Sequence, residues 1–381
     1  MYVPIPSRGT TKKIREEYKG IKEDLQYDGR LKIYRYNLMA LRKSTLLRAL
    51  RYFIQNFKQY GKGIKTRNVD LIFTDSTPPT QGAVCALIKK KLSKKQKKQV
   101  PFVYKLQDIF PDSLVNAGMA KKGSLLYKIG RKIENYTYKN ADKIIVISDG
   151  MKTNLMQKGV PEDKVAVIPN WIDTDEIKPV SRENNRLFDE YNISRNKCVV
   201  LYAGNFGASQ GTDVILDAAK MLEGEKAIQF VLFGGGSEFE KAKSAVTEKG
   251  LTNVIINPLL PPERISEVYS MGDIALITCK KGVGQAAMPS KTYSIMACNT
   301  PIIAAFDTDS DLADLLKKSG CGICVEPENA EALATEIKNK YDEWSSNINN
   351  KCDSRNYVKN SLSKDICVSK YLSVIEELID A

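Results

Sequence analysis

Two glycine-rich turns in the second half of the chain have the residue types expected of a phosphate-binding site. They lie at Gly204–Gly211 and Gly234–Gly236, and each follows a strand-like apolar run and precedes a predicted helix. Glycine lets the backbone approach a ligand closely, and the free amides of a helix N-terminus attract phosphate. Neither turn has the spacing of a dinucleotide site or a P-loop, which disfavours those ligands. Ordinary strand-to-helix turns are the alternative interpretation.

A lysine at the start of another predicted helix points to the same kind of ligand. Pro289 suits the first position of a helix, and Ser290 and Lys291 would then lie in its first turn. A cation there opposes the helix dipole, so its presence needs another reason. A bound diphosphate would supply one, because Lys291 and the free amides would converge on the same anion. A solvated lysine is the alternative.

Residue types that are missing or isolated exclude other chemistries. The chain has no histidine, which rules out Ser-His-Asp and Cys-His nucleophiles and histidine-ligated zinc. Its eight cysteines lie mostly in apolar runs and are predicted to be reduced, buried thiols. Cys321 and Cys324 have CxxC spacing, but no second pair with zinc-site spacing follows, so two small residues in a strand are favoured over a metal or redox site.

The elements that must position these residues form two globular domains. The chain has 381 residues, 43% apolar and 27% charged, and no run approaches the roughly 18 apolar residues of a membrane span. Strands and helices alternate, which predicts doubly wound parallel sheets. Strands are expected at residues 69–74, 101–106, 143–147 and 165–168, and then at 198–203, 229–233, 253–256, 273–278, 301–304 and 322–325. Helices of the second half are expected at 211–222, 237–248, 262–270, 290–298, 309–318 and 328–342.

Residues 169–179 break this alternation and are interpreted as a linker. The predicted units are an N-terminal domain at 1–178, a C-terminal domain at 179–350, and C-terminal helices at 351–381 that can return to the first domain. Residues 1–36 are interpreted as irregular except for a strand at 31–36, and an amphipathic helix is expected up to residue 63. The first domain shows only about four strands and is therefore expected to be incomplete.

The positive charge of the chain is concentrated in its first half. Residues 1–180 carry a formal charge of +19, whereas residues 181–381 carry −6. This asymmetry suggests a surface that faces anionic lipid or nucleic acid, with solvated helix faces as the alternative. Seven lysines between Lys89 and Lys98 could each contribute about 1 kcal/mol against an anionic leaflet. Because this run contains no aromatic residue, nucleic acid is disfavoured.

Several ordered motifs resemble the GT-B glycosyltransferases of the family 4 type. They are the two glycine turns, residues 271–276 and the segment from Pro289 to Ile303. Residues 107–113 and 168–173 resemble the subgroup typified by the N-acetyl-L-fucosamine transferase WbuB. The resemblance covers the chain from about residue 70 to the C-terminus. It implies an α/β GT-B fold in which two doubly wound, Rossmann-like domains face each other across a cleft.

The resemblance also implies an activity. Such enzymes move a sugar from a nucleotide-sugar, here expected to be a UDP-sugar, with retention and without a metal or a cofactor. The donor lies in the C-terminal domain and a lipid-linked or saccharide acceptor against the N-terminal one. The product is expected to be a bacterial capsule, O-antigen or exopolysaccharide, made in the cytoplasm at the inner face of the plasma membrane. The basic first half would contact the anionic membrane, and no nucleic acid partner is expected.

The residue-by-residue match to the family is imperfect. Where many relatives have Arg and Lys-Gly in the first glycine turn, this chain has Asn205 and Gln210–Gly211. The two glutamates that many relatives use fall at Ala286 and Ser294. Lys291 is therefore the expected replacement cation for the leaving diphosphate, and Ser294 a weaker partner for a ribose hydroxyl.

The acceptor side of the site is expected at Asp108. Its carboxylate follows a predicted strand and could orient or deprotonate an acceptor hydroxyl, with a helix-capping role as the alternative. Asp108 and Lys291 are thus the predicted catalytic residues. The predicted nucleotide-sugar site comprises Gly204, Asn205, Gly207, Gln210, Gly235, Gly236, Pro289, Ser290, Lys291 and Ser294.

Two competing functions remain. The family opens with a strand and a Gly-Gly turn that residues 1–36 do not match, so about 50 residues are expected to be missing. A truncated remnant that binds nucleotide or membrane, or does nothing, is one alternative. The other is a GT-B-shaped UDP-sugar 2-epimerase, against which the absence of histidine counts.

Overall fold

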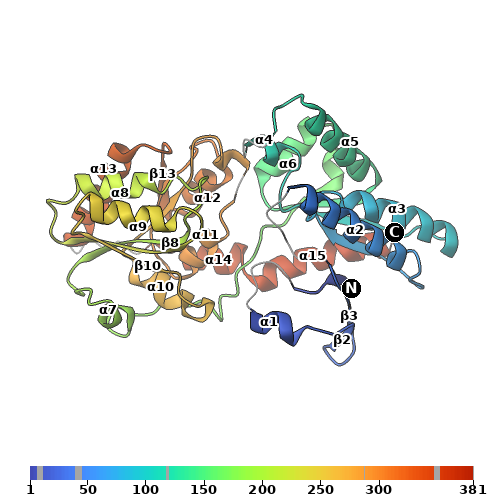
Figure 1. Cartoon of the computed structure of the whole chain (residues 1–381), viewed down its shortest axis with the longest axis horizontal. Helices are drawn as coiled ribbons and strands as arrows, with labels where there is room; N and C mark the ends of the chain where they lie inside the picture. Colours follow the sequence, from blue (N-terminus) through green and yellow to red (C-terminus); the bar gives the residue numbers. More distant parts are fainter. Residues whose placement is uncertain (7–11, 39–44, 117–119, 287, 347–351, 381) are drawn as a thin grey trace.

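The structure is a computed structural model and describes residues 1–6, 12–38, 45–116, 120–286, 288–346 and 352–380. Two α/β domains lie side by side (Figure 1). The C-terminal helices α14 (Ser354–Ser361) and α15 (Lys364–Ile379) run from the second domain back along the first. The prediction of two Rossmann-like domains with parallel sheets is confirmed.

The second domain is built on a six-stranded parallel sheet with the order β10-β9-β8-β11-β12-β13. Its strands are β8 (Cys198–Asn205), β9 (Ile228–Gly235), β10 (Val254–Pro258), β11 (Ile274–Thr278), β12 (Ile302–Ala305) and β13 (Gly322–Val325). The chain runs outward from β8 to β10, then crosses to the other side of β8 and continues outward from β11. The topological switch point therefore lies between β8 and β11, and ligands of open parallel sheets bind at the carboxyl ends of the strands at such points.

Both faces of this sheet are buried. The covering helices are α7 (Leu187–Glu190), α8 (Asp213–Met221), α9 (Phe239–Glu248), α10 (Ile265–Met271), α11 (Lys291–Ala297), α12 (Asp311–Ser319) and α13 (Ala330–Ser345). Along β8, Leu201 and Ala203 belong to one hydrophobic cluster, whereas Val200 and Tyr202 belong to the other. Strands that are buried on both faces have continuous apolar sequences. Such runs make strands easy to recognise, and each predicted strand and helix of the domain is present within three residues at either end.

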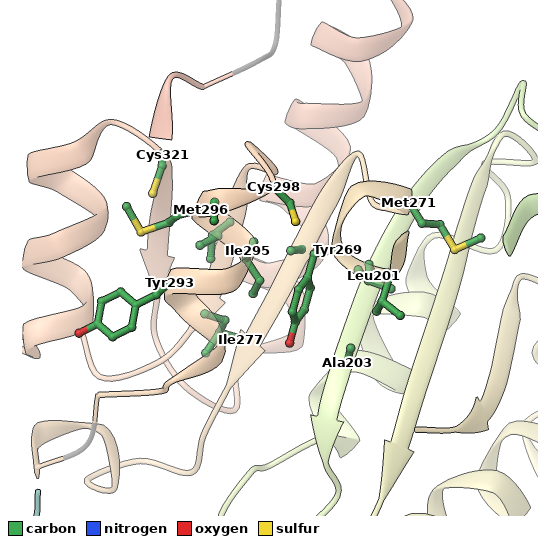
Figure 2. Close-up of a cluster of buried hydrophobic side chains, with 14 of the residues drawn as sticks. Leu201, Ala203, Tyr269, Met271, Ile277, Tyr293, Ile295, Met296, Cys298 and Cys321 are labelled. Carbon is green, nitrogen blue, oxygen red and sulfur yellow. The ribbon is translucent and has the colours of Figure 1, made fainter. Parts of the chain in front are cut away.

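The buried side of α11 fixes the position of the helix. Figure 2 shows Tyr293, Ile295 and Met296 of α11 in the same hydrophobic cluster as Ile277 of β11. Each of these side chains is almost fully buried. Lys291, the first residue of α11, is thereby held at the end of the sheet.

The first domain contains a four-stranded parallel sheet in the sequential order β4-β5-β6-β7. Its elements are β4 (Ile72–Asp75), α3 (Gln81–Gln96), β5 (Phe102–Lys105), α4 (Asp112–Asn116), α5 (Leu125–Asn140), β6 (Lys143–Val146), α6 (Asp149–Gln157) and β7 (Val165–Val167). One face of the sheet packs against α3, α5 and α6. On the other face, Val103 and Ile145 pack against Cys367 and Tyr371 of α15, so this last helix completes the core of the first domain.

The start of the chain is more regular than predicted. The expected strand at 31–36 is confirmed as β3 (Leu31–Tyr36). The segment before it was expected to be irregular, but it contains β1 (Tyr2–Pro4), α1 (Lys12–Glu17) and β2 (Glu23–Gln26). Strand β3 pairs in parallel with β1 and antiparallel with β2. Strand β2 was not predicted because its residues are mostly polar and exposed, so its sequence lacks the alternation of apolar and polar residues that marks a strand.

Helix α2 (Thr45–Gly63) is present, but its apolar side is exposed. Leu50, Phe53 and Phe57 are 45%, 69% and 72% exposed, whereas Arg51 and Gln55 of the same helix are buried. Periodicity identifies an apolar side of a helix without identifying the neighbour that it meets.

The structure refines the expectation that all seven lysines between Lys89 and Lys98 face solvent and the expectation that the cysteines are buried thiols. Lys89 does not join the basic surface, because its Nζ pairs with Asp142 Oδ2 at 2.7 Å and its side chain is only 18% exposed. Lys89 is therefore less available to an anionic surface than its neighbours Lys90 and Lys91, which are exposed. All eight cysteines are free, and six of them are buried.

Among the described helices, none has the length and apolar character to span a bilayer.

Candidate functional site

A pocket of about 420 Å³ opens at the switch point of the second domain. Gly204 and Asn205 at the end of β8 and Cys279 just after β11 line the pocket where these strands end. The full lining comprises Ala203, Gly204, Asn205, Gln210, Phe233, Leu259, Leu260, Pro261, Pro262, Ile265, Val268, Tyr269, Cys279, Val283, Met288, Pro289, Ser290, Lys291 and Phe306. The pocket therefore joins the first glycine turn to the start of α11, two segments that the sequence singled out separately.

Six of the predicted donor-site residues line this pocket, and four do not. The lining includes Gly204, Asn205, Gln210, Pro289, Ser290 and Lys291, and it does not include Gly207, Gly235, Gly236 and Ser294. Ser294 lies on α11 and is only 8% exposed. Helix α11 begins at Lys291 with Ser290 as its N-cap, so Pro289 precedes the helix and does not occupy its first position.

Two of the four remaining residues make room for Asn205. A Cβ on Gly207 would lie 2.6 Å from Asn205 Nδ2, and one on Gly236 would lie 2.2 Å from Asn205 Oδ1. Gly236 also has a φ of +123°, which disfavours other residues. These glycines serve the site indirectly, because they allow the Asn205 amide to lie between the two glycine turns.

Lys291 carries the charge of the pocket. Its Nζ lies 3.9 Å from the centroid of the Tyr202 ring. Among the described residues that line the pocket, Lys291 is the sole charged side chain, and no acceptor or carboxylate there pairs with its ammonium. Burial without a compensating anion lowers the pKa of Lys291 to about 7. An anionic ligand that enters the pocket would therefore stabilise the charged form of Lys291.

One wall of the pocket is apolar, and the sequence analysis did not predict it. Leu259, Leu260 and the two following prolines come from the turn after β10, and Phe233 comes from β9. An apolar wall beside a cation suits a ligand with an apolar ring and a phosphate. The available signal was a Leu-Leu-Pro-Pro turn directly after a predicted strand in the same half of the chain.

Asp108 lies outside this pocket, in the segment between β5 and α4. It is an exposed residue, but partial desolvation of its carboxyl raises the pKa, against opposing hydrogen bonds from Ser113 and the backbone of Ile109. Its neighbour Gln107 exchanges two amide hydrogen bonds with Asn170, at 3.1 and 3.0 Å. The structure thus joins the two segments, 107–113 and 168–173, that the sequence analysis paired.

The two domains meet beside the pocket. The Gly150 amide at the start of α6 donates to Asp311 Oδ1 at the start of α12, at 2.8 Å. A Cβ on Gly150 would lie 2.7 Å from Asp311 Oδ2, so glycine permits this approach. Met288 packs against the hydrophobic cores of both domains. The loop that leads to Lys291 is therefore held by both domains.

The fold and this pocket define the class of architecture: two Rossmann-like domains, with a pocket at the switch point of the second, have the GT-B fold. Residues 18–176 match the family Glycosyltransferase Family 4, and residues 183–358 match Glycosyl transferases group 1. The chain thus combines a domain of the Glycosyltransferase Family 4 type with a domain of the Glycosyl transferases group 1 type, and it has the GT-B fold.

Two curated relatives support this assignment. The chain is 29% identical over 240 residues to the putative colanic acid biosynthesis glycosyl transferase WcaI of Escherichia coli K12, covering 62% of this chain and 59% of the relative. It is 30% identical over 238 residues to the probable glycosyltransferase WbjE of Pseudomonas aeruginosa, covering 62% of this chain and 58% of the relative. The aligned region thus spans about three fifths of the length of these relatives.

Solved structures share the fold. Sucrose-phosphate synthase from Thermosynechococcus elongatus superposes with a TM-score of 0.72 at 17% identity, covering 100% of this chain and 88% of that protein. The Anabaena protein HepE, in complex with UDP, superposes with a TM-score of 0.70 at 15% identity, covering 91% of this chain and 86% of that protein. At these identities the likeness extends to the architecture alone.

Proposed function

We propose that this chain transfers a sugar from a UDP-sugar to a lipid-linked or saccharide acceptor in the synthesis of a bacterial surface polysaccharide. The observation that carries the proposal is the half-buried Lys291, whose ammonium lies against an aromatic ring in a pocket whose described lining contains no carboxylate. The charge of a buried ammonium is normally satisfied by an anion. A diphosphate in the pocket would provide that anion.

The same cation would serve the reaction. When the glycosidic bond to the donor breaks, negative charge develops on the leaving diphosphate, and a fixed cation stabilises this charge. Asn205 and Gln210 line the pocket as neutral hydrogen-bonding groups in the positions where cations are common. Lys291 would therefore carry the electrostatic part of catalysis, with retention and without a metal.

Asp108 is proposed to serve the acceptor. Its raised pKa brings the carboxyl closer to the range in which it can accept a proton from a hydroxyl group. The WcaI relative, named for colanic acid biosynthesis, supports a polysaccharide product. The exposed lysines of α3 would place the enzyme at the inner face of the plasma membrane, where a lipid-linked acceptor is found.

UDP is proposed over GDP because HepE, which shares the fold, has been solved with UDP and with UDP-glucose. Calorimetric titration of the purified chain with UDP, GDP and uridine tests this assignment. We expect UDP to bind, GDP to bind at least about tenfold more weakly, and uridine about a hundredfold more weakly because it lacks the diphosphate. Equal binding of uridine and UDP, or no binding of UDP by a folded chain, would contradict the proposal.

A further inference from the structure

We propose that Tyr202 is a positioning residue of the donor site, whose aromatic ring holds the Lys291 ammonium where the donor diphosphate binds. This inference rests on the function proposed above. It adds a residue that neither the glycine turns nor the helix-start pattern singled out.

The contact between the two residues is close. Lys291 Nζ lies 3.9 Å from the centroid of the Tyr202 ring, well inside the roughly 6 Å over which the face of an aromatic ring attracts a cation. Tyr202 belongs to the hydrophobic cluster on one face of the sheet, whereas α11 packs into the cluster on the other face. The lysine side chain therefore crosses the carboxyl ends of the strands to reach the ring. Gly204 permits this path, because a Cβ there would lie 3.0 Å from Nζ.

The ring is more rigidly held than the lysine. Tyr202 is completely buried, and its ring packs edge-on against Phe206 with the centroids 5.2 Å apart. Its hydroxyl donates to the backbone carbonyl of Asn205 at 2.8 Å. A free lysine side chain samples many rotamers, whereas a lysine over a fixed ring is already ordered when the ligand arrives. Tyr202 thereby lowers the entropic cost of placing the cation.

A ring suits this role better than a carboxylate. A carboxylate beside Lys291 would hold the ammonium but would also neutralise the charge that the diphosphate requires. The ring attracts the ammonium through its quadrupole and leaves the net positive charge in the pocket. Since Asn205 and Gln210 are neutral, the described lining of the pocket offers no second cation to share this task.

The pH dependence of UDP binding reports on the contact. Burial lowers the pKa of Lys291 to about 7, and the ring face favours the charged form and so opposes this shift. Besides Tyr202, whose ring the ammonium contacts, the titratable groups in the described lining of the pocket are Tyr269 and Cys279. Burial raises the pKa of each of them, so they stay neutral near physiological pH. Within this pocket, the titration near pH 7 therefore belongs to Lys291.

The test compares two substitutions at one position. Tyr202→Leu removes the ring, whereas Tyr202→Phe keeps the ring and removes only the hydroxyl. UDP is titrated into each variant and into the wild type between pH 5.5 and 9, and the proteins are compared at equal pH so that the titration of UDP itself cancels. We expect Tyr202→Leu to weaken binding about tenfold at pH 6 and to lose binding at a lower pH than the wild type, and Tyr202→Phe to stay within about twofold.

A folded Tyr202→Leu variant with the affinity and pH dependence of the wild type would overturn the inference. A measurement on the wild type covers the case in which this variant does not fold. In protein labelled with ¹³C at the lysine ε-carbon, the Lys291 signal, assigned by its loss in Lys291→Met, is expected to be shifted upfield by the ring current of Tyr202. An unshifted signal would also overturn the inference. Failure of the proposed function would look different, because Lys291→Met would then bind UDP as the wild type does.

Discussion

Replacement of Lys291 with methionine is expected to weaken UDP binding about a hundredfold at pH 6, a loss of about 2.7 kcal/mol. Methionine fills a similar volume but cannot carry charge, so the variant keeps the pocket shape and removes its cation. Calorimetric titration of UDP into both proteins measures the effect. The expected difference becomes smaller as the pH rises above 7, because the wild-type ammonium loses its proton there.

The matched control is Lys95→Met on α3. Lys95 is exposed and lies in the first domain, outside the donor pocket, so its replacement removes the same charge from the chain without touching the site. UDP affinity should stay within about twofold of the wild type, because exposed charges at a distance are screened by salt. Equal losses in the two variants would show that Lys291 acts only through net charge and would remove it from the site.

The same lysine should make the unliganded protein less stable. Its pKa is about 7 in the folded chain and ordinarily 10.5, so between these values the unfolded chain binds the proton that the folded chain has lost. Wild-type stability therefore increases with pH through this window, and below pH 7 the full cost of burying the ammonium applies. Lys291→Met should raise the free energy of unfolding at pH 6 by about 2 kcal/mol, allowing for partial solvation of the pocket. In urea denaturation, this gain should vanish towards pH 10.

Replacement of Gly234 with alanine is expected to destabilise the second domain by about 3 kcal/mol. A Cβ at this position would lie 2.0 Å from one carbon of the Phe206 ring and 2.1 Å from another. The ring has little room to move, because it packs edge-on against Tyr202 and Phe239 at 5.2 and 5.5 Å. Urea denaturation of the variant and the wild type measures the loss.

The neighbouring glycine provides the control. A Cβ on Gly235 would meet nothing closer than Leu259 Cδ1 at 3.8 Å, an ordinary van der Waals contact. Gly235→Ala should therefore change the free energy of unfolding by less than about 0.5 kcal/mol. If both variants were equally stable, the close packing of Gly234 on Phe206 would not describe the protein in solution. The second glycine turn thus begins with a residue that the fold requires, ahead of any contact with a ligand.

Local sequence determined the elements of the second domain and the two segments that form its pocket. Strands buried on both faces carry continuous apolar runs, and the turns between them carry glycine, so these features are visible without a structure. The positions of Gly204, Asn205 and Lys291 at the ends of such elements, together with the rule that ligands bind there, were enough to bring them to one site.

Contacts between distant segments were decided only by the tertiary structure. The ring of Tyr202 under Lys291, the contact of Gly234 with Phe206 and the return of α15 to the first domain each join residues that no local pattern relates. The exposed apolar side of α2 has the same origin, since periodicity describes a helix face and not its neighbour. The lowered pKa of Lys291 depends on burial without a counter-charge. Sequence pattern can place a lysine at a helix start, but only packing in three dimensions determines which groups surround its charge.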